Sequence, residues 1–330
     1  MGRGLAQWIH HRQRILSKRR NIVKQWVRGC SDDIPHLYLI QSGRMSKFNL
    51  NCGCKLCHYY KHMGNAKSRL SFRDKRQLKI NRKKMKIGIM GYGEIGKAIS
   101  TCYSSKATGK FDVLVKEVDK DDFTKGMKLV HICIPFSNEF IGHVTEMAFK
   151  YKPDHIVIHS TVMVGTTEAI GEILDCDVFH SPVRGVHPNL YSGLLAFEKW
   201  IGYEEKSYEH TGWLGGHFRK LGMIPVFKKG TRTTELAKLL STTYYGAIIA
   251  FHDYANNICK EECLDFDDVM TKWNNSYNSG YKKLKMGNVV RPVLYAPEGR
   301  IGGHCVIPNV MLLKAQYGSH SALQSILDLG

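Results

Sequence analysis

The sequence predicts an α/β protein in which a doubly wound, mostly parallel sheet is followed by an α-helical domain and preceded by a basic extension. Three observations support this prediction. Short apolar runs alternate with helical patterns from Met85 onward, a glycine-rich turn follows the first run, and the net charge of +19 comes from residues 1–86. That segment holds 22 Lys and Arg against three acids, whereas residues 87–330 hold 26 of each. A neutral globular unit therefore follows a separate basic segment.

The elements are expected in a regular order. Continuous apolar runs predict strands of a parallel sheet that is covered on both faces; they occupy 86–90, 112–118, 128–135, 155–160, 177–182 and 199–203. Helical patterns fill 94–105, 138–150, 166–174 and 208–221. From about residue 232 a long stretch without proline predicts one long helix. We therefore expect a basic extension at 1–84, a Rossmann-type domain at 85–230, and a helical domain at 231–330.

The turn after the first strand reads GYGEIG and fits the G-x-G-x-x-G pattern of dinucleotide-binding domains. Gly91 permits a tight turn, Gly93 lets the backbone approach a pyrophosphate, and Gly96 lets the following helix pack on the strand. Glu94 and Ile95 open that helix, whose free N–H groups face the anion. The turn therefore predicts that residues 85–230 bind a dinucleotide; a glycine turn without a ligand is the alternative.

An acid near the end of the second strand is expected to bind the ribose hydroxyls. Glu117 and Asp119 both satisfy the spacing. An acid at this position favours NAD over NADP, although the neighbouring Lys116 and Lys120 leave NADP open.

Five further segments, taken with the glycine turn, point to a known family. In chain order they are ICIP (132–135), HSTVMVGTT (159–167), HSPVRG (180–185), ELAKLL (235–240) and GGHC (302–305). Together they resemble the UDP-glucose/GDP-mannose dehydrogenase family over residues 85–315. The resemblance implies an NAD-dependent oxidation of a sugar alcohol to a carboxylate, by way of an aldehyde held on a cysteine. It also implies a homodimer formed through the helical substrate domain.

The resemblance assigns roles to single residues. Cys305 occupies the position of the nucleophile, Lys238 that of a lysine assisting proton transfer, and Thr161 that of a threonine near substrate and cofactor. Pro135, the last residue of ICIP, is placed beside the cofactor. Simpler interpretations stay open. In these alternatives, Cys305 is a small buried residue after a turn, Thr161 only ends a strand, and Lys238 is a surface lysine paired with Glu235.

The chain departs from the family pattern at three positions and at its end. Val183 stands where the family has a glutamate that hydrolyses the thioester, Thr242 replaces an asparagine, and Asn309 replaces an acid. The chain ends 25 residues after Cys305, where the family continues into a nucleotide-sugar-binding domain. These departures predict a smaller substrate, such as a sugar, polyol or hydroxy acid, and leave two- and four-electron oxidation open. Candidates to replace the glutamate lie in the same segment: His180, Arg184 and His187.

The basic extension carries predictions of its own. A compact cysteine cluster followed by histidine suggests a zinc site; its ligands are Cys52, Cys54, Cys57 and His62, with His58 or Cys30 as alternatives. Reduced, unliganded cysteines are the other interpretation. Cations interleaved with aromatic residues suggest nucleic-acid binding, against a solvated, disordered tail. A second functional hypothesis follows: a catalytically impaired dinucleotide-binding sensor or scaffold, tethered to nucleic acid by residues 1–84.

Sequence features also bear on the compartment. The chain has no apolar run of about 18 residues and no secretory signal, so we expect no membrane contact. The ten cysteines are scattered and are expected to be reduced, which favours the cytoplasm. An Arg-rich, acid-poor start also fits a mitochondrial transit peptide, but its serine content is low.

Overall fold

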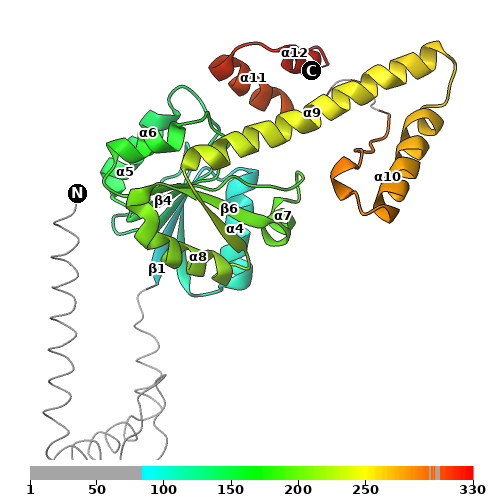
Figure 1. Ribbon diagram of the computed structural model, residues 1–330. Helices are drawn as coiled ribbons and strands as arrows, with labels where there is room; N and C mark the ends of the chain where they lie inside the picture. The colour runs from blue at the N-terminus through cyan, green and yellow to red at the C-terminus, as the bar shows by residue number, and fades with distance from the viewer. Residues whose placement is uncertain (1–83, 297–298, 300, 302–304, 330) are drawn as a thin grey trace, which may run out of the picture. The chain divides into compact units, whose positions relative to one another are not determined.

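The computed structural model describes residues 84–296, 299, 301 and 305–329, and the structural statements below concern these residues (Figure 1). The predicted zinc ligands Cys52, Cys54, Cys57 and His62 lie outside the described residues. The same holds for residues 1–83 of the predicted nucleic-acid-binding segment.

A seven-stranded sheet forms the centre of the described structure, with strand order β2-β1-β3-β4-β5-β6-β7. Its strands are β1 (Met85–Met90), β2 (Phe111–Lys116), β3 (Leu129–Ile132), β4 (His155–Ile158), β5 (Asp177–His180), β6 (Glu198–Tyr203) and β7 (Ile224–Lys229). All neighbouring strands are parallel except β5 and β6, which meet antiparallel at His180 and Gly202. The predicted mostly parallel sheet is confirmed. Its order reverses between β1 and β3, where open α/β sheets form a ligand crevice at their carboxyl edge.

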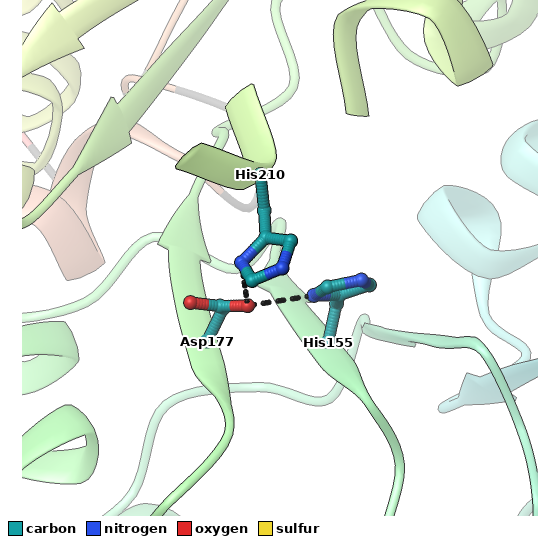
Figure 2. A group of neighbouring side chains, drawn as sticks. All are labelled: His155, Asp177 and His210. Carbon is teal, nitrogen blue, oxygen red and sulfur yellow. Dashed lines mark hydrogen bonds and ion pairs between the residues drawn. The ribbon is translucent and has the colours of Figure 1, made fainter. Parts of the chain in front are cut away.

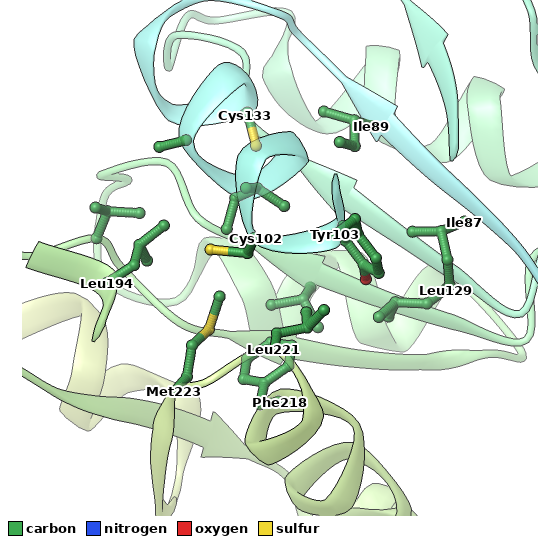
Figure 3. Close-up of a cluster of buried hydrophobic side chains, with 14 of the residues drawn as sticks. Ile87, Ile89, Cys102, Tyr103, Leu129, Cys133, Leu194, Phe218, Leu221 and Met223 are labelled. Atoms are coloured by element: carbon green, nitrogen blue, oxygen red, sulfur yellow. The ribbon is translucent and has the colours of Figure 1, made fainter. Parts of the chain in front are cut away.

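Helices cover both faces of the sheet, as a doubly wound fold requires. They are α4 (Glu94–Lys106), α5 (Phe140–Tyr151), α6 (Thr166–Ile173), α7 (Leu190–Ala196) and α8 (Thr211–Lys220), with the 3₁₀ helix η1 (Glu205–His210) before α8. On one face, Ile87 of β1 belongs to the same core as Cys102 of α4 and Phe218 of α8 (Figure 3). On the other face, Ile132 of β3 packs in a core with Val144 of α5. Alternate strand residues thus supply two separate cores.

Two elements were not predicted, and both omissions have a physical reason. Strand β7 reads IPVFKK, and its proline and lysines argue against a central strand. It lies at the edge of the sheet, where Pro225 removes no necessary hydrogen bond. Helix α7 has only seven residues, too few to show a helical period.

The helical region begins with α9 (Thr231–Glu261), which confirms the predicted long helix. The π-helical segment η2 (Asp267–Lys272), α10 (Trp273–Lys283), η3 (Gly287–Val289), α11 (Val306–Tyr317) and α12 (Ser321–Leu327) follow. Helix α9 packs on β5, β6 and β7, and α11 and α12 pack against α9. The remaining surface of α9 carries an exposed apolar stripe whose members are three, four or seven residues apart: Leu240, Tyr244, Phe251, Tyr254 and Ile258. None of the helices described is long and apolar enough to span a bilayer.

A chain of buried polar side chains runs through the core. Tyr103 Oη lies 2.7 Å from Nε2 of both His131 and His217, and His131 Nδ1 lies 2.8 Å from His159 Nε2. His159 Nδ1 donates to Ser181 O at 2.7 Å. Because that last acceptor is a carbonyl, His159 carries its proton on Nδ1. It follows that His131 donates from Nδ1 to His159, Tyr103 donates to His131, and His217 donates from Nε2 to Tyr103. All three imidazoles are neutral in this arrangement.

This network predicts a loss of stability in mild acid. Burial lowers the pKa of His131 and His159 well below the usual value, that of His217 to about 4, and that of His180 to about 3. Below about pH 6.5 the unfolded chain binds protons that the folded chain does not, so the free energy of unfolding falls as the pH drops toward 4. Denaturant titrations between about pH 7.5 and pH 5 measure this slope. We expect His217→Gln to make the slope shallower; a slope that is flat in the unmodified chain contradicts the prediction.

Candidate functional site

The glycine turn lies at the carboxyl end of β1 and is shaped by close backbone contacts. Gly91 has a φ of +90°, and a Cβ built there would lie 2.8 Å from the carbonyl carbon of Cys133. A Cβ on Gly96 would lie 2.0 Å from the Gly91 oxygen, so α4 begins directly against the turn. No described heavy atom lies within 4 Å of a Cβ built on Gly93. The outer side of the turn is therefore open at Gly93.

The turn faces the crevice at the reversal of strand order. Gly93 is the N-cap of α4, and the first N–H groups of this helix have no partner within it. Pro135 is exposed just beyond β3, and Thr161 is half-buried just beyond β4. These two predicted site residues thus lie at the same carboxyl edge of the sheet as the turn.

Of the two acids that follow β2, Glu117 is the one that reaches the turn. Its carboxylate accepts a hydrogen bond from the backbone N–H of Tyr92, while Asp119 is exposed. Both neighbouring lysines are occupied elsewhere: Lys116 Nζ lies 2.8 Å from a carboxylate oxygen of Asp121, and Lys120 Nζ lies 2.8 Å from one of Asp122. The geometry therefore separates Glu117 from Asp119, which the sequence did not.

Three residues that are far apart in sequence meet beside the turn. Cys305 is the N-cap of α11, and its Sγ lies 3.4 Å from His187 Nε2. His187 Nδ1 in turn contacts the carboxylate of Glu94, the first residue of α4. An N–H on Nδ1 that donates to Glu94 leaves Nε2 free to accept a proton from the thiol. Glu94 was predicted as a cofactor-binding residue, and its carboxylate contacts His187.

Lys238 lies close to the nucleophile position. It is half-buried on α9, and its Nζ donates to Val183 O at 3.0 Å. Burial lowers the pKa of Lys238, and the negative charge of a Cys305 thiolate acts in the opposite direction. Thr242, one turn further, donates its hydroxyl to the Lys238 carbonyl at 3.1 Å and is thereby used within the helix. Asn309, one turn after Cys305, is buried and its Nδ2 has no partner among the described residues.

Glu235 serves a different purpose from pairing with Lys238. One of its carboxylate oxygens accepts the Gly165 N–H at 2.6 Å and the other accepts the Thr167 N–H at 2.8 Å. These donors belong to the start of α6, so the buried carboxylate caps that helix. The interpretation of Lys238 as one half of a surface ion pair with Glu235 is wrong.

A buried lysine that the sequence did not reveal lies behind the same segment. Lys199 of β6 is only 3% exposed, and its Nζ donates to Ser181 O and to Pro182 O, the latter at 2.9 Å. Burial lowers the pKa of Lys199 to about 7. Together with Lys238 on Val183 O, two amino groups hold three successive carbonyls. They fix the backbone where the resembling family has its glutamate.

Only one of the three candidates in HSPVRGVHP reaches the cysteine. Both ring nitrogens of His180 are used inside the core, Nδ1 at 2.8 Å from Thr234 Oγ1 and Nε2 at 3.2 Å from Ser160 O. Arg184 donates to a backbone carbonyl of β6. His187 is thus the member of this segment that contacts the nucleophile position. Its role follows from tertiary contact, and the only sequence signal was its presence in the segment.

No protein-family model and no curated protein sequence matches the chain. Solved structures resemble its fold. UDP-D-ManNAc dehydrogenase from Pyrococcus horikoshii matches with a TM-score of 0.59 and 17% identity, over 74% of this chain and 68% of that one. NDP-N-acetyl-D-galactosaminuronic acid dehydrogenase from Methanosarcina mazei Go1 matches with a TM-score of 0.55 and 17% identity, over 77% and 67%.

A shorter protein matches over nearly its whole length. The 3-hydroxyisobutyrate dehydrogenase of Mycobacterium tuberculosis has a TM-score of 0.54 and 12% identity, and the match covers 74% of this chain and 92% of that one. Identities this low establish fold and not activity. The chain therefore has the Rossmann-type fold, with a following helical region, that is found in nucleotide-sugar and hydroxyacid dehydrogenases.

Proposed function

We propose that the chain is an NAD-dependent oxidoreductase that oxidises an alcohol group of a sugar, polyol or hydroxy acid by hydride transfer. One observation carries this proposal. Cys305 contacts His187, and His187 contacts Glu94, which opens the helix after the glycine turn. A nucleophile position and a dinucleotide-type turn are therefore joined at one edge of the sheet.

The described residues fit a dinucleotide. The open side of Gly93 and the free N–H groups of α4 suit a pyrophosphate. The Glu117 carboxylate suits a ribose diol, and Lys116 and Lys120, which flank it in sequence, are both paired with acids rather than free for the extra phosphate of NADP. These features support NAD as the cofactor.

The residues of the chain can move the protons that such an oxidation requires. Bound NAD supplies the hydride acceptor. Lys238, whose pKa is lowered by burial, accepts the proton of the substrate hydroxyl on Nζ as the carbonyl forms. His187 Nε2 can then take the proton of the Cys305 thiol, and the thiolate adds to an aldehyde carbon while Lys238 returns a proton to its oxygen. A thiohemiacetal on Cys305 results, with Glu94 beside the charged imidazole.

The surroundings of Cys305 bear on substrate and partner. Val183 is buried and cannot act as a base, so the fate of the bound aldehyde depends on other groups. The exposed stripe of α9, with members three, four or seven residues apart, has the spacing of a helix–helix seam. It supports a second copy of the chain as the partner, as the resemblance implies.

Gly93→Val is expected to abolish NAD binding. A valine side chain would project into the open side of the turn, where the pyrophosphate has to approach the backbone. Calorimetry with NAD should show a dissociation constant on the order of micromolar to millimolar for the unmodified chain, the range typical of substrate and coenzyme sites. Gly216→Val on α8 is the matched control, because a Cβ there also meets no described atom within 4 Å. Equal binding by all three proteins contradicts the assignment of the turn.

A further inference from the structure

Two histidines and one aspartate meet at the edge of the sheet opposite the glycine turn. His155 is the first residue of β4 and Asp177 the first residue of β5, and the two are register partners on neighbouring parallel strands. His210 is the last residue of η1, immediately before α8. All three side chains point toward one another (Figure 2). The amino edge of the sheet thus carries a compact His–Asp–His cluster.

The three side chains present their donor atoms to a common point. His155 Nδ1 and His210 Nδ1 each lie 2.8 Å from the same oxygen of Asp177, Oδ2. Each of the three residues offers one ligand atom, and these three atoms lie within 4.8 Å of one another. Ligands bound to one tetrahedral zinc at about 2.0–2.1 Å are about 3.3 Å apart. The observed separations need only a small adjustment to surround an ion.

Hydrogen bonding accounts for only part of this cluster. The contact of His155 Nδ1 with Asp177 is a hydrogen bond, but the equally short contact of the solvent-shielded His210 Nδ1 with Asp177 does not have hydrogen-bond geometry, and this atom has no hydrogen bond among the described residues. His155 Nε2 is also buried without a partner in the described structure. Buried polar atoms in proteins are paired in the great majority of cases. A cation between the rings and the carboxylate would bind the lone pair of His210 Nδ1, which no hydrogen bond in the described structure satisfies.

Charge and enclosure also suit a cation. Within the described structure Asp177 forms ion pairs with histidines only, so neither lysine nor arginine neutralises its charge. His155 is 2% exposed and Asp177 12%, whereas His210 is 40% exposed. The Trp213 ring lies 4.7 Å from the His155 ring and shields the inner side. The cluster is thus a largely enclosed negative site with one open side at His210.

We propose that His155, Asp177 and His210 bind a divalent transition-metal ion of the zinc class, with water in the remaining position on the open side. Two imidazole nitrogens and one carboxylate oxygen match the preferences of such ions. Magnesium and calcium require about six or more oxygen ligands, which this cluster does not supply. Because the site lies at the amino edge of the sheet, away from Cys305, its role is to tie β4, β5 and η1 together.

Metal titration of the full chain tests this proposal. Because Cys52, Cys54 and Cys57 are themselves candidate ligands, all three are replaced by serine, and the protein is stripped with chelator before Co²⁺ is added. We expect one equivalent to bind with visible d–d absorption and without a sulfur-to-metal charge-transfer band. Zn²⁺, but not Mg²⁺, should raise the melting temperature.

Variants of the cluster decide between a metal site and a hydrogen-bond cluster. His210→Ala removes the most exposed ligand and should weaken Co²⁺ binding at least about 100-fold, since even supporting residues around metals contribute about 10–100-fold. Asp177→Asn preserves the shape and should have a similar effect. His143→Ala, an exposed histidine on α5, is the control and should bind as the parent does. Absence of binding by the parent, or undiminished binding by both cluster variants, overturns the proposal.

Discussion

Replacing Cys305 with alanine is expected to leave the first oxidation intact and to reduce the second by about 10³-fold or more, as losses of covalent nucleophiles do. Without the sulfur, the aldehyde cannot be held as a thiohemiacetal and is released. In the four-electron version of the reaction the yield of NADH per substrate then falls from about two to about one. The measurement is end-point NADH absorbance together with chromatography of the acid product.

The control for this experiment is Cys263→Ala, which removes an exposed cysteine beyond the end of α9. It should behave like the unmodified chain. Acid formation by the Cys305 variant at the unmodified rate would show that the covalent role is wrong. A yield of about one NADH from the unmodified chain would instead indicate the two-electron version, in which Val183 leaves the carbonyl as the final product.

His187→Gln is expected to slow the Cys305-dependent step by about 10²–10⁴-fold, the usual contribution of a general base. Glutamine keeps a hydrogen-bonding group near the sulfur but cannot accept its proton. Above about pH 8.5, where ordinary thiols ionise without help, the loss should shrink because hydroxide replaces the base. The rate of acid formation, or of thiol alkylation by iodoacetamide, measured against pH provides the test.

His143→Gln serves as the matched control, because His143 is an exposed histidine on α5. A loss of the same size at every pH would indicate that His187 only positions Cys305 by packing. Unchanged alkylation and unchanged rates would show that the 3.4 Å contact has no chemical role. Either result leaves the assignment of the glycine turn untouched, because that assignment rests on separate contacts.

Local patterns predicted most of the Rossmann-type domain. The β1–turn–α4 unit could be predicted because one short apolar run and three glycines lie within a dozen residues. Strand β7 could not, because its position at an edge permits Pro225, a residue that is excluded from central strands. The long α9 was predictable from its continuous helical pattern, whereas α7 was too short to produce one.

The candidate site was predictable only where a motif is continuous in sequence. Cys305 and His187 are 118 residues apart, and Glu94 lies another 93 residues from His187, so their contacts arise only when the chain folds. The burial of Lys199 could not be predicted from the sequence for the same reason. In KWIGY it resembles a solvent-facing lysine, yet the sheet buries it and lets it bind two backbone carbonyls. Burial of such a residue depends on neighbours supplied by distant segments.

The position of Glu94 has a kinetic consequence. This residue belongs to the turn that would receive the coenzyme phosphates, while its carboxylate contacts the imidazole beside the sulfur. Coenzyme phosphates bound at the turn would lie beside this carboxylate, so any shift of the carboxylate on binding would also act on His187 and, through it, on Cys305. By reciprocity, reversible binding of an aldehyde at Cys305 would change coenzyme affinity by the same factor. The expected behaviour is a rate of Cys305 alkylation that changes when NAD is added, and an affinity for NAD that changes when an aldehyde is held on the sulfur.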